Sequence, residues 1–351
     1  MIGPKAGPMT ARPALAVAIS VLSAALAAGA PAVAHAERAL SYDEPGTYPV
    51  QVVDVVWRDE SRQRDLPLRI RLPDAPGLRP LVIFSHGLGG SIEGGRAWGK
   101  HWASYGLAVI HVQHPGSDQS LWQDSNNPAR DLRHAADLAQ FVARVADVKF
   151  ILDELQRRQA RGDPIASRVD LGRVGMSGHS FGAITTQALA GQTYKVARAR
   201  QAAADMLREP RFAAFVAFSP SARKASDSQQ FSAITHPFLS VTGSDDGKVG
   251  AGLGVPPELR RVPYSGMPPG DKYLLVLNGA DHMIFNGGGR TAAHLPHSTQ
   301  PDPARDAQIE RIVRAATTAF WLAYLADDPP ARQWLRTVGS SIGEAGTFSA
   351  K

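Results

Sequence analysis

Short apolar segments typical of buried strands alternate with amphipathic helical segments from about residue 50 to residue 325. Several of the strand segments are apolar at every position, as strands covered on both faces are. The expected strands are residues 50–57, 66–72, 80–85, 107–112, 169–176, 212–218, 236–242 and 272–277. The expected helices are residues 98–105, 128–158, 181–190 and 304–324. This alternation predicts an α/β fold whose mostly parallel central sheet carries helices on both faces.

The first two strands flank a polar turn at residues 59–65 and predict an antiparallel hairpin at the start of the sheet. There is no internal repeat and no long linker, so we expect one domain over residues 37–330, followed by a polar tail at 331–351. The longest insertions, residues 193–211 and 247–271, are basic and Gly/Pro-rich respectively. Neither is typical of an apolar helical cover, so no large lid domain is expected.

The N-terminus has the pattern of a secretory signal peptide. Lys5 and Arg12 precede an apolar run at residues 14–30, and Ala34 and Ala36 provide the small-x-small cleavage site. We therefore expect cleavage after Ala36 and a secreted or periplasmic protein with no stable membrane anchor. An uncleaved anchor is the alternative, which a Gly and a Pro near the end of the apolar run disfavour.

Composition excludes several classes of function. The chain has 351 residues and a formal charge of +6, but its Lys and Arg residues form no block, so a nucleic-acid partner is not expected. Without cysteine there is no disulfide, no thiolate nucleophile and no Cys-liganded zinc. His111 and His114 straddle a strand end at a spacing that turns the two rings apart, so neither a metal nor another cofactor is expected.

The sequence Gly178-His179-Ser180-Phe181-Gly182 directly follows an expected buried strand and directly precedes an expected helix. This setting predicts a strand-turn-helix elbow that raises the Ser180 hydroxyl above the edge of the sheet. Small residues are needed on both sides of the serine because the turn is tight. Ser180 is therefore the candidate nucleophile.

A serine hydroxyl needs a base to take its proton, and the base in turn needs an orienting acid. His282 follows the expected strand 272–277, at the same edge of the sheet as Ser180. Two adjacent acids, Asp245 and Asp246, follow the preceding strand, and on position alone either one can orient the imidazole. The chain order of serine, acid and histidine is that of the elbow fold.

A glycine-rich loop, residues 87–95, follows the expected strand 80–85. Such a loop places backbone N–H groups at the edge of the sheet, where they can stabilise a developing oxyanion. The N–H groups of Leu88 and Phe181 are the expected donors.

These motifs together resemble the α/β-hydrolases, and among them the bacterial exported proteins similar to dienelactone hydrolases and platelet-activating-factor acetylhydrolases. The matching stretches are residues 86–91, 111–118, 178–182 and 279–282, within most of residues 50–325. The resemblance implies an α/β-hydrolase catalytic domain at residues 37–330 and ester hydrolysis by Ser180, Asp246 and His282. It selects Asp246 because the family's Gly-x-x-Asp pattern falls on Gly243 and Asp246.

The chain departs from true dienelactone hydrolases, which use a cysteine nucleophile. Its elbow looks more like those of phospholipid acetylhydrolases and some polyester-degrading enzymes. The resemblance thus implies an exported serine carboxylic-ester hydrolase acting on short-acyl esters, which are small, phospholipid-like or polymeric. A serine peptidase or amidase of the same fold and a non-catalytic binding protein are the alternatives.

Trp98, Trp102 and Trp122 lie near the motif loops and are candidates for substrate binding, although the first two have a spacing equally typical of a core. The oligomeric state is left open.

Overall fold

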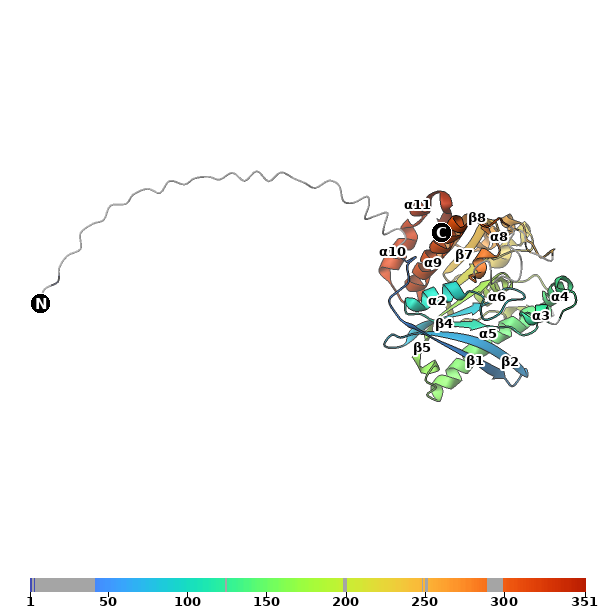
Figure 1. The fold of residues 1–351 in the computed structure, drawn as a ribbon, viewed down its shortest axis with the longest axis horizontal. Coiled ribbons are helices and arrows are strands. Elements are labelled where there is room, and N and C mark those ends of the chain that lie inside the picture. Colours follow the sequence, from blue (N-terminus) through green and yellow to red (C-terminus); the bar gives the residue numbers. More distant parts are fainter. Residues whose placement is uncertain are drawn as a thin grey trace.

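The structure is a computed structural model that describes residues 42–123, 125–197, 201–247, 249, 252–288 and 299–351, together with residues 1 and 3. Apart from residues 1 and 3, the predicted signal peptide and its cleavage site lie outside the described residues. The described part of the chain forms a nine-stranded sheet in the order β1-β2-β4-β3-β5-β6-β7-β8-β9 (Figure 1).

The central strands of this sheet run parallel. In spatial order they are β4 (Ala108–Val112), β3 (Arg79–Ser85), β5 (Val169–His179), β6 (Phe212–Phe218), β7 (Phe238–Asp245) and β8 (Lys272–Asp281). At one edge β1 (Val50–Asp59) and β2 (Arg64–Pro73) form the predicted antiparallel hairpin, and β2 pairs antiparallel with β4. The predicted α/β architecture with a mostly parallel sheet is confirmed.

Alternate side chains of the central strands enter two separate cores, one on each face of the sheet. In β3, Leu81 and Ile83 belong to the core that holds α5 (Leu138–Ala160) and α6 (Phe181–Ala190). Their neighbours Val82 and Phe84 belong to the core that holds α2 (Arg96–Ser104) and α9 (Pro303–Leu325). Because both faces are covered, the parallel strands are apolar at nearly every position.

The helix expected over residues 128–158 is in fact two helices, α4 (Pro128–Ala135) and α5. The break occurs where the Asp137 carboxylate accepts a hydrogen bond from the N–H of Gln140 at 2.8 Å. An aspartate at this position satisfies one of the free N–H groups of a new helix and so starts α5 afresh. The periodicity of the apolar residues continues across the break, which is why the sequence pattern merges the two helices.

The C-terminal segment is part of the fold, which corrects the expectation of a polar tail at residues 331–351. It contains α10 (Pro329–Thr337), α11 (Gly339–Ile342) and β9 (Gly346–Ala350). Trp334 and Leu335 of α10 are buried, and β9 pairs antiparallel with β8. The described C-terminus therefore closes the edge of the sheet next to β8 (Figure 1).

The remaining elements are short and connect the strands. They are α3 (Ser120–Gln123), α7 (Gln201–Asp205), α8 (Pro257–Gly266) and the 3-10 helices η1 (Ala166–Arg168), η3 (Ala225–Phe231), η5 (Ile284–Asn286) and η7 (Gly343–Ala345). Helix α8 lies within the Gly/Pro-rich insertion and packs against β7 and η3. None of the described helices combines the length and the apolarity that crossing a membrane requires.

Candidate active site

The Ser180 turn joins the end of β5 directly to the start of α6, as the sequence predicts. Ser180 has a φ of 56°, a left-handed conformation that costs a non-glycine residue about 1–3 kcal/mol. A Cβ atom at Gly178 would collide with the carbonyl of Gly182, and one at Gly182 would collide with the carbonyl of Ser85. Only glycine fits at these two positions, and the strained turn between them leaves the Ser180 side chain at the carboxyl edge of the sheet.

His282 and Asp246 form a buried pair at the same edge. His282 directly follows β8, and its Nδ1 donates to Asp246 Oδ1 at 2.6 Å. Thr242 Oγ1 donates to the second carboxylate oxygen of Asp246 at 2.7 Å. Because the proton of the imidazole is on Nδ1, Nε2 is left as an acceptor, which is the form that a general base needs.

The buried Arg260 of α8 completes the surroundings of this pair. Its Nε lies 3.3 Å from Asp246 Oδ1, and its Nη2 lies 3.3 Å from His282 Nδ1. Its Nη1 donates to the carbonyl of Ser219 at 3.0 Å. Arg260 was not predicted from the sequence, because an arginine in a Gly/Pro-rich insertion has no pattern that marks it as buried.

The charges around the pair keep Asp246 ionised and His282 neutral. Burial opposes ionisation of Asp246, but the charge of Arg260 and the contact with His282 hold the pKa of Asp246 below its usual value. Burial lowers the pKa of His282, and the charge of Arg260 lowers it further against the opposing effect of Asp246. The imidazole is therefore unprotonated at neutral pH and able to accept a proton.

His179, the residue before the serine, supports the loop that carries His282. Its Nε2 lies 2.9 Å from the carbonyl oxygen of His282, and the centroids of the two rings are 4.7 Å apart. Burial lowers the pKa of His179 to about 3, so its Nε2–H donates as a neutral imidazole. His179, next to Ser180 in the elbow, thus holds the backbone of His282 in place.

The glycine-rich loop after β3 lies against the elbow. The N–H groups of Gly89 and Gly90 donate to the carbonyls of Ser117 and Gly87, at 2.9 and 3.1 Å. Those of Leu88 and Phe181 make no hydrogen bond within the described part of the chain. Both residues line the same cavity as Ser180, so these two N–H groups are free to bind an oxyanion there.

A cavity of about 150 Å³ holds these groups together. Its apolar walls come from the glycine-rich loop after β3, from α3 and α6, and from the insertion before α8. They include Leu88, Trp122, Phe181, Ile184, Val249, Leu253 and Val255. Ser180 and His282 both line it, although Ser180 Oγ makes no hydrogen bond to another described residue. Contacts between a nucleophile and its base often form only when substrate binds.

The three tryptophans proposed for substrate binding are divided between the cavity and the core. Trp122 lines the cavity, and its Nε1 donates to the carbonyl of Gly89 at 2.8 Å. Trp98 and Trp102 are fully buried and stack on Phe218 beneath the sheet edge. The structure therefore corrects the expectation for these two, whose helical spacing reflects packing against the strands.

Comparison with known proteins identifies no family for this chain. No family model matches the chain, and a search of curated proteins also finds no match. Among the described residues, no three histidine, aspartate or glutamate side chains are grouped as a metal site requires.

Proposed function

We propose that this protein is a serine carboxylic-ester hydrolase with the α/β-hydrolase fold, similar to the exported dienelactone-hydrolase and platelet-activating-factor-acetylhydrolase group. The observation that carries the proposal is the shared cavity of Ser180, the Asp246-bonded His282, and the unpaired N–H groups of Leu88 and Phe181. These are the nucleophile, the oriented base and the oxyanion donors of acyl transfer.

The reaction follows from these roles. Ser180 Oγ attacks the ester carbonyl carbon while His282 Nε2 takes its proton, and the resulting oxyanion accepts hydrogen bonds from the N–H groups of Leu88 and Phe181. The intermediate then collapses, and the alcohol leaves with the proton from His282. In the second half, His282 Nε2 takes a proton from water, which attacks the acyl carbon on Ser180. His282 then gives that proton to Ser180 Oγ as the bond between Oγ and the acyl carbon breaks and the acid is released.

The volume of the cavity favours a small acyl group. A cavity of about 150 Å³ holds roughly one benzene-sized group. A chain much longer than about six carbons would extend into solvent and gain little of the ~0.8 kcal/mol that each buried CH₂ can contribute. We therefore propose short-acyl esters as substrates, with small esters, acetylated phospholipids and polyesters as the classes to compare.

The decisive experiment combines labelling with a substrate series. A fluorophosphonate probe is expected to label the wild-type protein at Ser180, and Ser180→Ala is expected to abolish labelling and to lower ester hydrolysis by about four orders of magnitude. Ser221→Ala changes another serine that lines the cavity and is expected to remain labelled. Labelling that survives Ser180→Ala would contradict the proposal.

The substrate series distinguishes the alternatives. Rates on nitrophenyl esters from two to sixteen carbons are expected to peak at short acyl groups and to show no jump at the micelle threshold. A faster rate on a peptide amide would favour the peptidase alternative. An absence of both activities in folded protein would favour a binding protein.

Export is a separate part of the proposal. The N-terminal pattern supports cleavage after Ala36, so secreted protein is expected to begin at Glu37. Intact-mass measurement of the exported protein tests this. A mass that includes residues 1–36 would contradict it.

A further inference from the structure

Arg144 is a fully buried cation in the middle of the apolar face of α5. It lies among Phe141, Val145 and Val148, which are all buried in the core on that face. Removing a guanidinium from water costs several kcal/mol unless its N–H groups are bound. A charged residue at an apolar helical position is therefore a feature that needs a specific partner.

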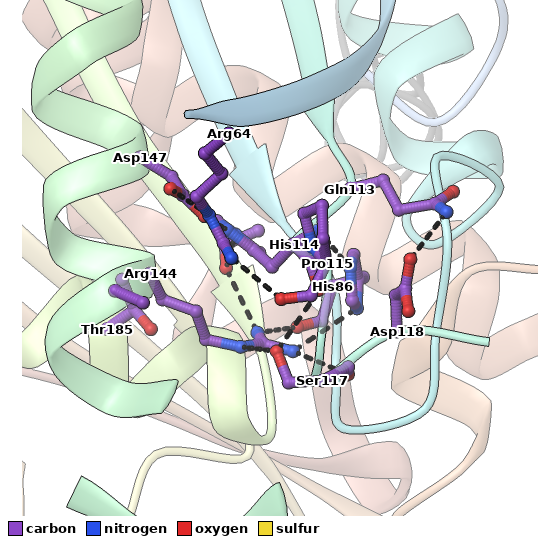
Figure 2. A network of polar contacts seen from close by, with 12 residues as sticks. Arg64, His86, Gln113, His114, Pro115, Ser117, Asp118, Arg144, Asp147 and Thr185 are labelled. Carbon is purple, nitrogen blue, oxygen red and sulfur yellow. Dashed lines mark hydrogen bonds and ion pairs between the residues drawn. The ribbon is translucent and has the colours of Figure 1, made fainter. Parts of the chain in front are cut away.

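Arg144 donates its hydrogen bonds to His86, at the start of the glycine-rich loop after β3, and to Ser117, in the loop after β4 (Figure 2). Nη1 donates to the carbonyl of His86 at 2.6 Å, while Nε and Nη2 donate to the hydroxyl and the carbonyl of Ser117 at 2.8 and 3.1 Å. No carboxylate of the described residues lies within ion-pair distance of Arg144. The nearby Asp147 is bound instead by Arg62, Arg64 and His114.

The Gly87 carbonyl connects Arg144 to the oxyanion site, because this carbonyl and the N–H of Leu88 belong to one peptide group. It accepts hydrogen bonds from His86 Nδ1 at 2.5 Å, from the N–H of Gly90 at 3.1 Å and from Arg144 Nη2 at 3.4 Å. Donors on the oxygen of an amide polarise it and make its N–H a stronger donor. The N–H of Leu88 is the unpaired end of this polarised peptide.

Arg144 also contacts the residue that supplies the second N–H. Its guanidinium carbon lies 4.5 Å from the centroid of the Phe181 ring, within the range of a cation–π interaction. One buried cation thus touches the peptide group of Leu88 and the side chain of Phe181. It also places a positive charge behind the position where negative charge develops in the transition state.

We propose that Arg144 is a positioning residue for the oxyanion site, holding the N–H groups of Leu88 and Phe181 in place and strengthening them for a tetrahedral acyl or phosphonyl oxyanion. This inference rests on the proposed serine hydrolase activity. If Arg144 had a purely structural role, its replacement would leave transition-state binding unchanged once the protein has folded. A positioning role predicts a lower rate in the folded variant, so kinetics distinguishes the two.

The test compares Arg144→Lys and Arg144→Met with the wild type. Lysine retains the charge but not the planar fork, and methionine removes both. Loss of one oxyanion donor costs about 10²–10³ in kcat, so we expect Arg144→Met to lower kcat about 100-fold while KM changes less than about threefold. The rate of phosphonylation of Ser180 is expected to fall by a similar factor, with a smaller loss in Arg144→Lys.

Ser117→Ala is the matched control because it removes the hydroxyl bound by Arg144 Nε and leaves the contacts to the Gly87 carbonyl in place. We expect it to lower the melting temperature but to change kcat by less than about threefold. If Arg144→Met does not fold, the phosphonylation rates of Arg144→Lys and Phe181→Leu test the proposal instead. Phe181→Leu deletes the ring but keeps the N–H, and it is expected to slow phosphonylation about fivefold, the equivalent of a cation–π contact of about 1 kcal/mol.

Two negative outcomes are distinguishable. If the wild-type protein is labelled and the folded Arg144 variants are phosphonylated at the wild-type rate, the role of Arg144 is overturned and the proposed function stands. If the folded wild-type protein neither reacts with the phosphonate nor hydrolyses esters, the proposed function fails and this inference fails with it.

Discussion

Asp245 and Asp246 are adjacent in the chain but lie in opposite environments. Asp245 is exposed at the end of β7, where the hydroxyl of Ser244 contacts it at 3.2 Å. Asp246 is fully buried and lies 2.6 Å from His282 Nδ1. The tight turn after Gly243, where a Cβ would collide with the carbonyl of Ala280, directs the second acid inward.

This arrangement predicts unequal effects of the two amide substitutions. Asp246→Asn is expected to lower kcat/KM about 10⁴-fold, because an amide favours the wrong tautomer of His282. Asp245→Asn is the matched control and is expected to change kcat/KM less than about threefold. Steady-state kinetics on a nitrophenyl ester measures both, and losses of equal size would assign the orienting role to neither acid alone.

A second prediction concerns Arg260 and the pH dependence of the reaction. The charged and titratable groups facing His282 are Asp246 after β7, Arg260 of α8, His179 of β5 and Asp281 of β8. Arg260 lowers the pKa of His282, so its removal is expected to raise that pKa. The base would then be protonated at a higher pH.

Arg260→Met is therefore expected to move the acidic limb of the kcat/KM profile to higher pH. The exposed neighbour Arg261 provides a matched control, because Arg261→Met removes the same charge from the same helix without a contact to the pair. An unchanged limb in Arg260→Met, with the protein folded, would show that Arg260 does not tune the base.

The buried histidines predict a loss of stability in acid. Burial lowers the pKa of His111 to about 3 and those of His101 and His114 to about 4. Their pKa in the unfolded chain is about 6.5, so below that pH the unfolded state binds more protons than the folded state. The part of the free energy of unfolding that depends on these histidines being neutral is fully present above about pH 6.5. It is lost as the pH falls towards 4.

Urea unfolding at a series of pH values measures this effect. Each such histidine contributes a slope of up to about 1.4 kcal/mol per pH unit to the free energy of unfolding between about pH 6 and pH 5, above the range in which most carboxylates titrate. His111→Gln is expected to reduce the slope by about one proton, whereas His134→Gln changes an exposed histidine and is expected to leave it unaltered. A free energy of unfolding that does not depend on pH in this range would contradict the prediction.

The parts of the site that the sequence predicted are those that local geometry determines. Ser180 and its flanking glycines lie in one turn, and the end of β5 and the start of α6 fix where that turn lies. Arg144 and Arg260 were missed because their burial depends on loops that follow or precede them by tens of residues. For Arg144 a signal was present, since a charge interrupts an apolar helical face, but its partners cannot be read from that pattern.

The errors in the fold have two causes, one local and one distant. The break before α5 depends on a single capping carboxylate of Asp137, and β9 depends on pairing with the distant edge strand β8. Neither leaves a change in hydrophobic periodicity. The spacing of Trp98 and Trp102 is compatible with either a substrate site or the core, and only their packing against Phe218 places them in the core.

The last prediction concerns the limit on acyl length. Ile184 of α6 lines the cavity one turn after Ser180, so its side chain is placed to limit the space for an acyl group. Ile184→Ala is expected to shift the preferred nitrophenyl ester to a longer chain by about one to three carbons, because each additional CH₂ that becomes buried contributes up to ~0.8 kcal/mol. The rate on the shortest ester is expected to fall, because an acetyl group no longer fills the enlarged cavity.

Ile165→Ala is the matched control, since Ile165 packs against the same core but does not line the cavity. It is expected to lower the melting temperature without altering the order of preference among the esters. A uniform decrease across all chain lengths in Ile184→Ala would show that this side chain supports the elbow instead of limiting the substrate. An unchanged preference would mean that the acyl group lies against another wall, which the corresponding substitution Val255→Ala then tests.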